Sequence, residues 1–135
     1  MSFLTPLYAH QVGFKDGREI WELDAPLVWK RPDGSNVVAP PGFQTDFCSV
    51  PRHPAFVFGI FGARLDRQGT LHDLAYRIDS NPQFTYDQAN LFFKEVCQDR
   101  YDGEADDPEV EIMYSVLVSC GRGSYHKLKM EDKLI

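Results

Sequence analysis

The distribution of apolar and polar residues divides the chain into a strand-rich first part and a helical second part. Segments rich in β-branched and aromatic side chains predict strands over residues 19–23, 27–30 and 36–39. The sequence Arg31-Pro32-Asp33-Gly34-Ser35 is typical of a hairpin turn, because proline presets φ and glycine accepts a positive φ. We therefore expect the second and third strands to pair antiparallel. Pro40-Pro41-Gly42 is expected to end the sheet.

The second part of the chain contains residue patterns that typically begin a helix. The first predicted helix begins at Thr70 as N-cap, with Asp73 as its N3 partner, and ends near residues 79–82. The second has Thr85 as N-cap and Gln88 at N3, which together form a capping box.

A third helix is predicted from Asp107, with Pro108 in its first turn and Gly121 at its C-terminal end. Its apolar residues recur at helical spacing and predict a buried stripe made of Val110, Met113, Tyr114 and Leu117.

The order of these elements predicts one α+β domain over residues 1–135. Residues 1–43 form its strand-rich part, a small N-terminal antiparallel sheet, and residues 44–69 form a long loop of the kind that is usually functional. Residues 70–122 contain the three helices, of which the first two are expected to pack antiparallel. Residues 123–135 form a tail that either docks or frays.

Composition and charge narrow the class of protein. With 135 residues, 43% hydrophobic and 25% charged, the chain is expected to be a soluble globular domain. Its 14 basic and 20 acidic residues give a net charge of −6, which argues against a nucleic-acid partner. The N-terminus predicts neither a signal peptide nor a transmembrane segment. The three cysteines include no C-x-x-C pair and are expected to be buried thiols.

The stretch His72-Asp73-Leu74-Ala75-Tyr76-Arg77 carries the most specific chemistry. On a helix, His72 and Tyr76 share a face at positions i and i+4, whereas Asp73 points about 100° away from His72. Imidazole is a suitable general base near neutral pH, and an amide such as Asn90 on the next helix can orient it. A carboxylate beside it, Asp73 together with Asp46, can hold a hard cation that polarises a carbonyl group.

Each of these residues also has a structural explanation. Asp73 is expected as the capping partner of Thr70 and Asp46 as the centre of an Asx turn. Tyr76 fits a half-buried core position, and Arg77 is expected at the surface. Ser49 has no adjacent base in the sequence, so we expect it to be a turn residue rather than a nucleophile.

Three motifs resemble a family of small phage and prophage proteins of unknown function. Their pattern is P-x-G-F-x-T-D-x-x-S-x-P-R over residues 40–52, H-D-x-x-Y over residues 72–76, and A-D-x-x-F over residues 89–93, where this chain has Asn90 in place of Asp. The resemblance implies a bacteriophage origin, synthesis in the cytoplasm of a bacterial host and incorporation into the virion, without an established activity.

The His72 segment and Asn90 are also similar to the two-helix core of prokaryotic phospholipase A2. This resemblance implies that His72 is the general base for a water molecule, that Asp73 binds calcium, and that Tyr76 and Asn90 support His72. The chain departs from the pattern at Asn90, where both families favour Asp. It also lacks a glycine-rich calcium loop of the usual form before His72.

Two functional hypotheses follow. The first is a phage-encoded, calcium-assisted hydrolase with His72, Tyr76 and Asn90 as catalytic residues and Asp73 and Asp46 as metal ligands. It acts on host membrane lipid or another envelope component through an apolar entrance formed by Phe56, Phe58 and Phe61. The second is a non-catalytic virion or assembly protein that retains the site in degenerate form. Other virion proteins are the expected partners in both.

Overall fold

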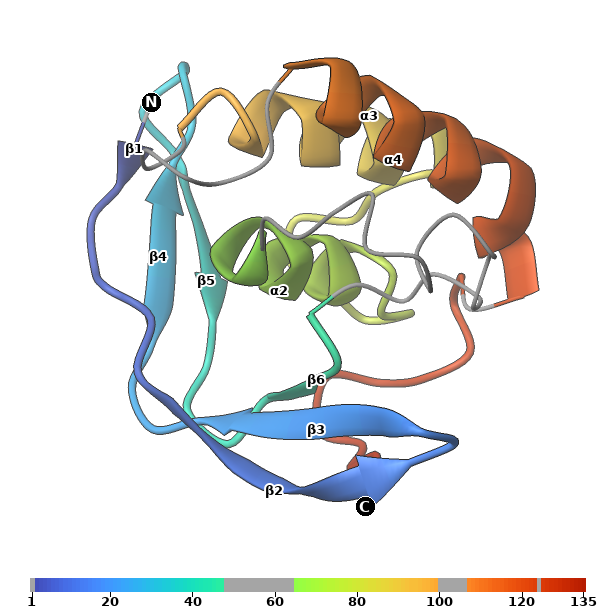
Figure 1. The fold of residues 1–135 in the computed structure, drawn as a ribbon. Helices are drawn as coiled ribbons and strands as arrows, with labels where there is room; N and C mark the ends of the chain where they lie inside the picture. Colours follow the sequence, from blue (N-terminus) through green and yellow to red (C-terminus); the bar gives the residue numbers. More distant parts are fainter. Residues whose placement is uncertain (1, 48–64, 100–106, 124) are drawn as a thin grey trace.

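Strands precede helices along the chain, which confirms the predicted α+β class (Figure 1). The computed structural model describes residues 2–47, 65–99, 107–123 and 125–135. Within these ranges the strands are β1 (Ser2–Phe3), β2 (Ala9–Lys15), β3 (Arg18–Leu23), β4 (Leu27–Lys30), β5 (Asn36–Ala39) and β6 (Gln44–Thr45). The α-helices are α2 (Asp66–Ala75), α3 (Tyr86–Val96) and α4 (Asp107–Cys120), and the 3₁₀ helix η1 (Gly121–Gly123) follows α4 directly.

The strands form two three-stranded antiparallel sheets, ordered β1-β4-β5 and β2-β3-β6. The expected hairpin between β4 and β5 is confirmed, with Lys30 opposite Asn36 and with Gly34 at a φ of 89° in the turn. Pro40-Pro41-Gly42 ends the β1-β4-β5 sheet, as predicted, but the chain then enters the second sheet. Gly42 takes a φ of 84° and turns the chain back along β3, so that β6 pairs with β3.

Helix α2 lies at the centre of the fold, with the two sheets on one side and below, and with α3 and α4 above it in the view of Figure 1. Its contacts with α3 run in opposite directions along the two helices. Gln68 donates to the carbonyl oxygen of Asp99, whereas Tyr76, ten residues from the start of α2, packs on Tyr86. The predicted antiparallel arrangement of these two helices is therefore confirmed.

Helix α2 begins at Asp66, four residues before the predicted start. Thr70 is an interior residue, and its hydroxyl donates to the carbonyl oxygen of Asp66. The prediction of Thr70 as N-cap is therefore wrong. From Arg67 to Ala75 the polar and the apolar residues of α2 are all buried, so the polar first turn does not look like part of an amphipathic helix. The capping box of α3, formed by Thr85 and Gln88, is confirmed.

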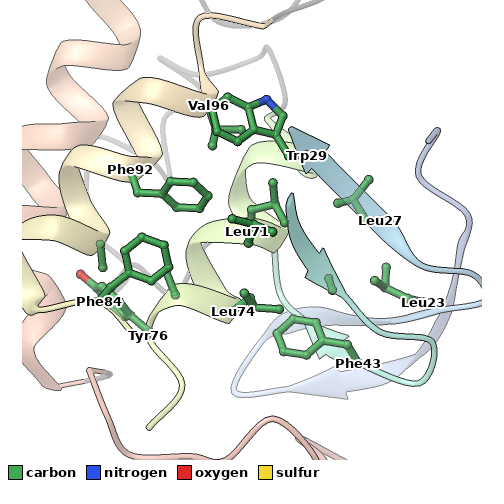
Figure 2. Packing of buried hydrophobic residues seen from close by; sticks show 14 of the residues in the cluster. Leu23, Leu27, Trp29, Phe43, Leu71, Leu74, Tyr76, Phe84, Phe92 and Val96 are labelled. Carbon is green, nitrogen blue, oxygen red and sulfur yellow. The ribbon is translucent and has the colours of Figure 1, made fainter. Parts of the chain in front are cut away.

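The main core forms where α2 meets the β1-β4-β5 sheet and α3. In Figure 2, Leu71 and Leu74 of α2 face Trp29 and Phe43 from the sheet side and Phe92 from α3. A second cluster joins α3 to α4 and includes Val110, Met113 and Leu117, as the helical stripe predicts, together with Leu65, Phe93 and Cys97. Tyr114 is half-buried and lies under the ammonium group of Lys94.

The C-terminal tail docks on the rest of the fold. The backbone N–H of Ile78 donates to the carbonyl oxygen of Leu128, and the N–H of Met130 donates to Asp79. Further along, the N–H groups of Leu134 and Ile135 both donate to Oε1 of the buried Gln44. Within the described ranges, the helices are too short or too polar to cross a lipid bilayer.

We expect Leu71→Ala to lower the free energy of unfolding by about 2–5 kcal/mol, because Leu71 is completely buried and truncation leaves a cavity. Leu91→Ala is the matched control, since Leu91 is a helical leucine that is 53% exposed, and it is expected to change stability by less than about 0.5 kcal/mol. Urea unfolding at constant m-value measures both changes. Equal effects of the two substitutions would contradict the assignment of the core.

Candidate functional site

The side-chain oxygen of Asn90 is the hub of a buried polar cluster between α2 and α3. Tyr76 Oη donates to Asn90 Oδ1 over 2.6 Å, and His72 Nε2 lies 3.0 Å from the same oxygen. His72 and Asn90 are fully buried, and Tyr76 is 2% exposed. The structure thus brings together the three residues that the sequence analysis proposes as catalytic.

Helix geometry places these side chains. His72 is in α2 and Tyr76 caps its C-terminal end four residues later, so their rings share a face and their centroids lie 4.1 Å apart. Asn90 lies in the second turn of α3, whose start is fixed by the Thr85 capping box. Phe93, one turn further along α3, meets the His72 ring edge to face at 5.6 Å.

The environment of His72 favours the neutral imidazole. Burial lowers its pKa to about 4, against the smaller opposing effects of the hydrogen bond to Asn90 and of the Asp46 charge. Because Asn90 Oδ1 only accepts hydrogen bonds, the hydrogen-bond network assigns the ring proton to Nε2. The lone pair of the neutral ring is therefore on Nδ1.

Two buried atoms of this cluster have no hydrogen-bond partner among the described residues: His72 Nδ1 and Asn90 Nδ2. Buried polar atoms are nearly always paired in native proteins, so an exception calls for an explanation such as a catalytic role or a bound molecule. Nδ1 carries the lone pair with which an imidazole accepts a proton from water. Within the described part of the chain, the cluster thus has the tautomer of a general base and an acceptor nitrogen without a hydrogen-bond partner.

A second cluster joins Asp46, which follows β6, to Asp73 of α2. Thr45 Oγ1 donates to Asp73 Oδ2 over 2.5 Å and accepts a hydrogen bond from the backbone N–H of Phe47. Arg18 Nη1 of β3 lies 2.9 Å from Asp46 Oδ2. The Asx-turn and capping roles expected for Asp46 and Asp73 do not account for these contacts.

The acidic pair favours a bound proton on Asp46. The pKa of Asp46 is raised to about 7: burial is the largest cause, the charge and the hydrogen bond of Asp73 act in the same direction, and Arg18 opposes the rise. A carboxyl group in such a setting is partly protonated at neutral pH. It can donate a proton where an exposed aspartate cannot.

Gly69 allows the segment that carries Thr45 and Asp46 to pack against α2, which carries both His72 and Asp73. A Cβ atom at this position would lie 1.2 Å from the carbonyl oxygen of Phe47, so only glycine permits the backbone of Phe47 to lie directly against the helix. Asp73 is one turn after Gly69 and therefore faces the same segment. The contact places Thr45 and Asp46 beside Asp73.

Arg77 is buried, contrary to the surface position expected for it. Its guanidinium group donates to the carbonyl oxygens of Gln44 and Lys129 and lies 4.8 Å from the centre of the Phe43 ring. These contacts join the end of α2 to β6 and to the C-terminal tail. Burial lowers the pKa of Arg77, the charges of Asp73 and Asp46 oppose this shift, and the guanidinium group stays positively charged at neutral pH.

The described residues do not fit a calcium site at Asp46 and Asp73. Calcium takes six to eight oxygen ligands, whereas one oxygen of Asp46 is bound to the Arg18 guanidinium and one oxygen of Asp73 accepts the Thr45 hydroxyl. The described part of the chain has no cluster of three or more His, Cys, Asp or Glu side chains arranged to hold a metal ion. The calcium role of this pair stays a prediction, and no catalytic step below passes through a metal ion.

Other candidates lie outside the described residues: Ser49, Cys48 and the predicted entrance residues Phe56, Phe58 and Phe61. Conversely, the sequence analysis does not identify Arg18 or Thr45 as site residues. Thr45 directly precedes Asp46 in the P-x-G-F-x-T-D motif, and this position in the motif is the sequence feature that indicates Thr45 as a site residue. Arg18 has no such signal, because its position follows from the pairing of β3 with the two-residue strand β6.

Comparison with known proteins identifies a family. A family described as proteins of unknown function, DUF1353, matches residues 21–115. The search of curated proteins and the search of solved structures found no match. The matched region extends from within β3 to within α4 and contains Asp46, His72, Asp73, Tyr76 and Asn90. Because the match covers well over half of the chain, this protein belongs to the DUF1353 family.

Proposed function

We propose that this protein is a phage-encoded hydrolase in which His72 activates a water molecule for attack on an acyl ester. One observation carries the proposal: the buried Nδ1 atom of a neutral His72 has no partner among the described residues, while Asn90 holds the opposite ring nitrogen. An amide also orients the catalytic imidazole of papain-like cysteine proteases, so a carboxylate is not required for this task.

The proposed reaction needs one base and one acid. His72 Nδ1 takes a proton from water as the water oxygen bonds to the acyl carbon. When the carbon–oxygen bond to the leaving group breaks, the leaving oxygen takes a proton from the carboxyl group of Asp46. The products are a carboxylic acid and an alcohol, and the proton that His72 took from water then passes to Asp46 through solvent, which restores the neutral base and the protonated acid. Asp46 is hydrogen-bonded to Asp73, the residue that follows His72 in α2, and this neighbourhood favours a base and an acid that serve one substrate.

The substrate class and the setting of the proposal come from the sequence resemblances. Similarity to the helix core of phospholipase A2 favours phospholipid or another acyl ester of the host envelope. The three phage motifs favour a protein carried by the virion, which would deliver such an enzyme to the envelope.

A second candidate is a non-catalytic virion or assembly protein. The amide of Asn90 favours it, because a neutral group stabilises an imidazolium far less than a carboxylate does, and burial already disfavours protonation of His72. Under this hypothesis the protein has a fixed copy number in purified particles and hydrolyses none of the substrates named above.

Substitutions at His72 and Asn90 distinguish the two candidates. For the hydrolase, we expect His72→Ala to lower kcat by about 10²–10⁴-fold on phospholipid vesicles or soluble acyl esters, because the base is lost. We expect Asn90→Asp to raise kcat by about tenfold or more, because a carboxylate stabilises the imidazolium. Leu91→Ala, next to the hub but exposed, is the control. Absence of turnover in both the wild type and Asn90→Asp would exclude the hydrolase.

The pH dependence of kcat/KM tests the assignment of acid and base. His72 acts in its neutral form, so activity is expected to rise as the pH passes the His72 pKa of about 4. Asp46 acts in its protonated form, so activity is expected to fall above its pKa of about 7. A calcium site that uses ionised Asp46 predicts the opposite trend near pH 7, with activity that rises and depends on added calcium.

Stability measurements on Asp46→Asn test the protonation of Asp46 without any activity. The folded-state pKa is about 7 and the unfolded value is 3.8, so the folded wild type holds a proton that the unfolded chain releases. Wild-type stability therefore falls, relative to Asp46→Asn, as the pH rises from about 4 to about 7, by on the order of 1–3 kcal/mol. The contribution of His72 is present in both proteins and cancels. A constant difference over this range would show that Asp46 is ionised in the folded state.

A further inference from the structure

Gly121 lies directly behind the hydroxyl group of Tyr76. A Cβ atom at position 121 would lie 2.3 Å from Tyr76 Oη and 3.2 Å from Tyr76 Cζ, and 3.3 Å from Tyr86 Oη. A carbon and an oxygen atom that are not bonded to each other do not approach to 2.3 Å, which is shorter even than a hydrogen bond. Any side chain at this position would therefore displace Tyr76 from its place beside Asn90.

The backbone conformation does not explain why this residue is a glycine. Gly121 begins η1, directly after α4, and its φ is not in the positive range that favours glycine. By contrast, Gly34 and Gly42 have φ values of 89° and 84° and are turn residues. At Gly121 the requirement is space for the Tyr76 hydroxyl.

Tyr86 fixes the end of α4 relative to α3. Its hydroxyl lies 2.5 Å from the carbonyl oxygen of Leu117 and 2.7 Å from that of Val118, both in the last turn of α4. Tyr86 is one turn before Asn90 on α3. The same helix therefore carries the hub of the site and the residue that holds Gly121 in place.

The ring of Tyr76 is enclosed by further aromatic contacts. It stacks on Tyr86 with the centroids 6.0 Å apart, and Tyr125 packs against both rings at 5.5 Å. Tyr125 is held in turn by a hydrogen bond from its hydroxyl to the carbonyl oxygen of Phe84. With Gly121 behind its hydroxyl, Tyr76 has one position, in which Oη points at Asn90 Oδ1.

We propose that Gly121 and Tyr86 are positioning residues that fix the tautomer of His72 by holding the Tyr76 hydroxyl on Asn90 Oδ1. The inference rests on the proposed role of His72 as a base, because it concerns which ring nitrogen carries the lone pair. An amide can present either its oxygen or its NH₂ group to a neighbour. The Tyr76 hydroxyl donates to Asn90 Oδ1 over 2.6 Å, and this hydrogen bond favours the orientation in which the oxygen faces both Tyr76 and His72.

Loss of this donor allows the amide of Asn90 to turn over. Asn90 Nδ2 would then donate to His72 Nε2, which must carry the lone pair to accept it. The ring proton would move to Nδ1, where a base needs the lone pair. A displacement of Tyr76 by a side chain at position 121 would thus disable the base without touching His72.

The ¹⁵N NMR signals of the His72 ring test this proposal, since they distinguish a protonated from an unprotonated ring nitrogen. In the wild type at neutral pH we expect the protonated signal at Nε2 and the unprotonated signal at Nδ1. In Gly121→Ala we expect a partial or complete exchange of the two. Gly123→Ala is the matched control in the same 3₁₀ helix, because a Cβ atom there would meet no atom of the described residues within 4 Å. Identical His72 signals in Gly121→Ala and Gly123→Ala would overturn the proposal.

A double-mutant cycle with Tyr76→Phe identifies the clashing atom. Phenylalanine lacks the oxygen at 2.3 Å, so Gly121→Ala should lower the unfolding midpoint in the wild-type background and lower it much less in Tyr76→Phe. The double variant should keep the exchanged His72 tautomer, because the donor to Asn90 is still missing. An equal loss in both backgrounds would show that the hydroxyl is not what position 121 accommodates.

Tyr86→Phe keeps the ring and removes the hydroxyl that holds the end of α4, so it provides the test if Gly121→Ala does not fold. We expect the same exchange of His72 signals, to a smaller extent, and an unchanged tautomer in this variant would contradict the role of Tyr86. The NMR readout requires no substrate. A protein without hydrolytic activity that shows the predicted exchange would refute the proposed function and leave the positioning role intact.

Discussion

The contact between Gly69 and the backbone of Phe47 is the constraint on which the site depends. A helix surface normally keeps another backbone away by the length of its side chains, and here that separation is absent because a Cβ atom would lie 1.2 Å from the Phe47 oxygen. A glycine inside a helix costs roughly 1 kcal/mol relative to alanine. The contact offsets this cost because it holds β6 and Phe47 against α2, with Thr45 hydrogen-bonded to Asp73 one turn along the helix.

Burial acts in opposite directions on the two clusters that α2 carries. It removes the charged form of each group from water, so it lowers the pKa of the imidazole of His72 and raises the pKa of the carboxyl group of Asp46. A neutral base and a partly protonated acid are therefore expected to coexist at neutral pH, and burial is the main cause of both. The consecutive residues His72 and Asp73 make this possible, because they point to different sides of one buried helix.

The sequence predicts the His72, Tyr76 and Asn90 cluster well and the Asp46 and Asp73 cluster poorly, for physical reasons. The first depends on helical spacing and on a capping box, both of which are local patterns. The second depends on a two-residue strand, on a close backbone approach and on Arg18 from a neighbouring strand, and none of these has a periodic signal. The start of α2 and the position of Arg77 are also predicted wrongly, because polar residues of this segment are buried together with the apolar ones and the sequence shows no amphipathic pattern.

The amide at Asn90 changes what the rest of the cluster must supply. A carboxylate presents two equivalent acceptors, so it holds an imidazole N–H in either orientation and needs no neighbour to orient it. An amide has one acceptor, and its orientation depends on a second donor. Tyr76 is that donor, and its hydroxyl occupies space that exists because residue 121 has no side chain. A site with asparagine at the hub thus depends on residues as distant as the end of α4, whereas a site with aspartate would depend on them much less.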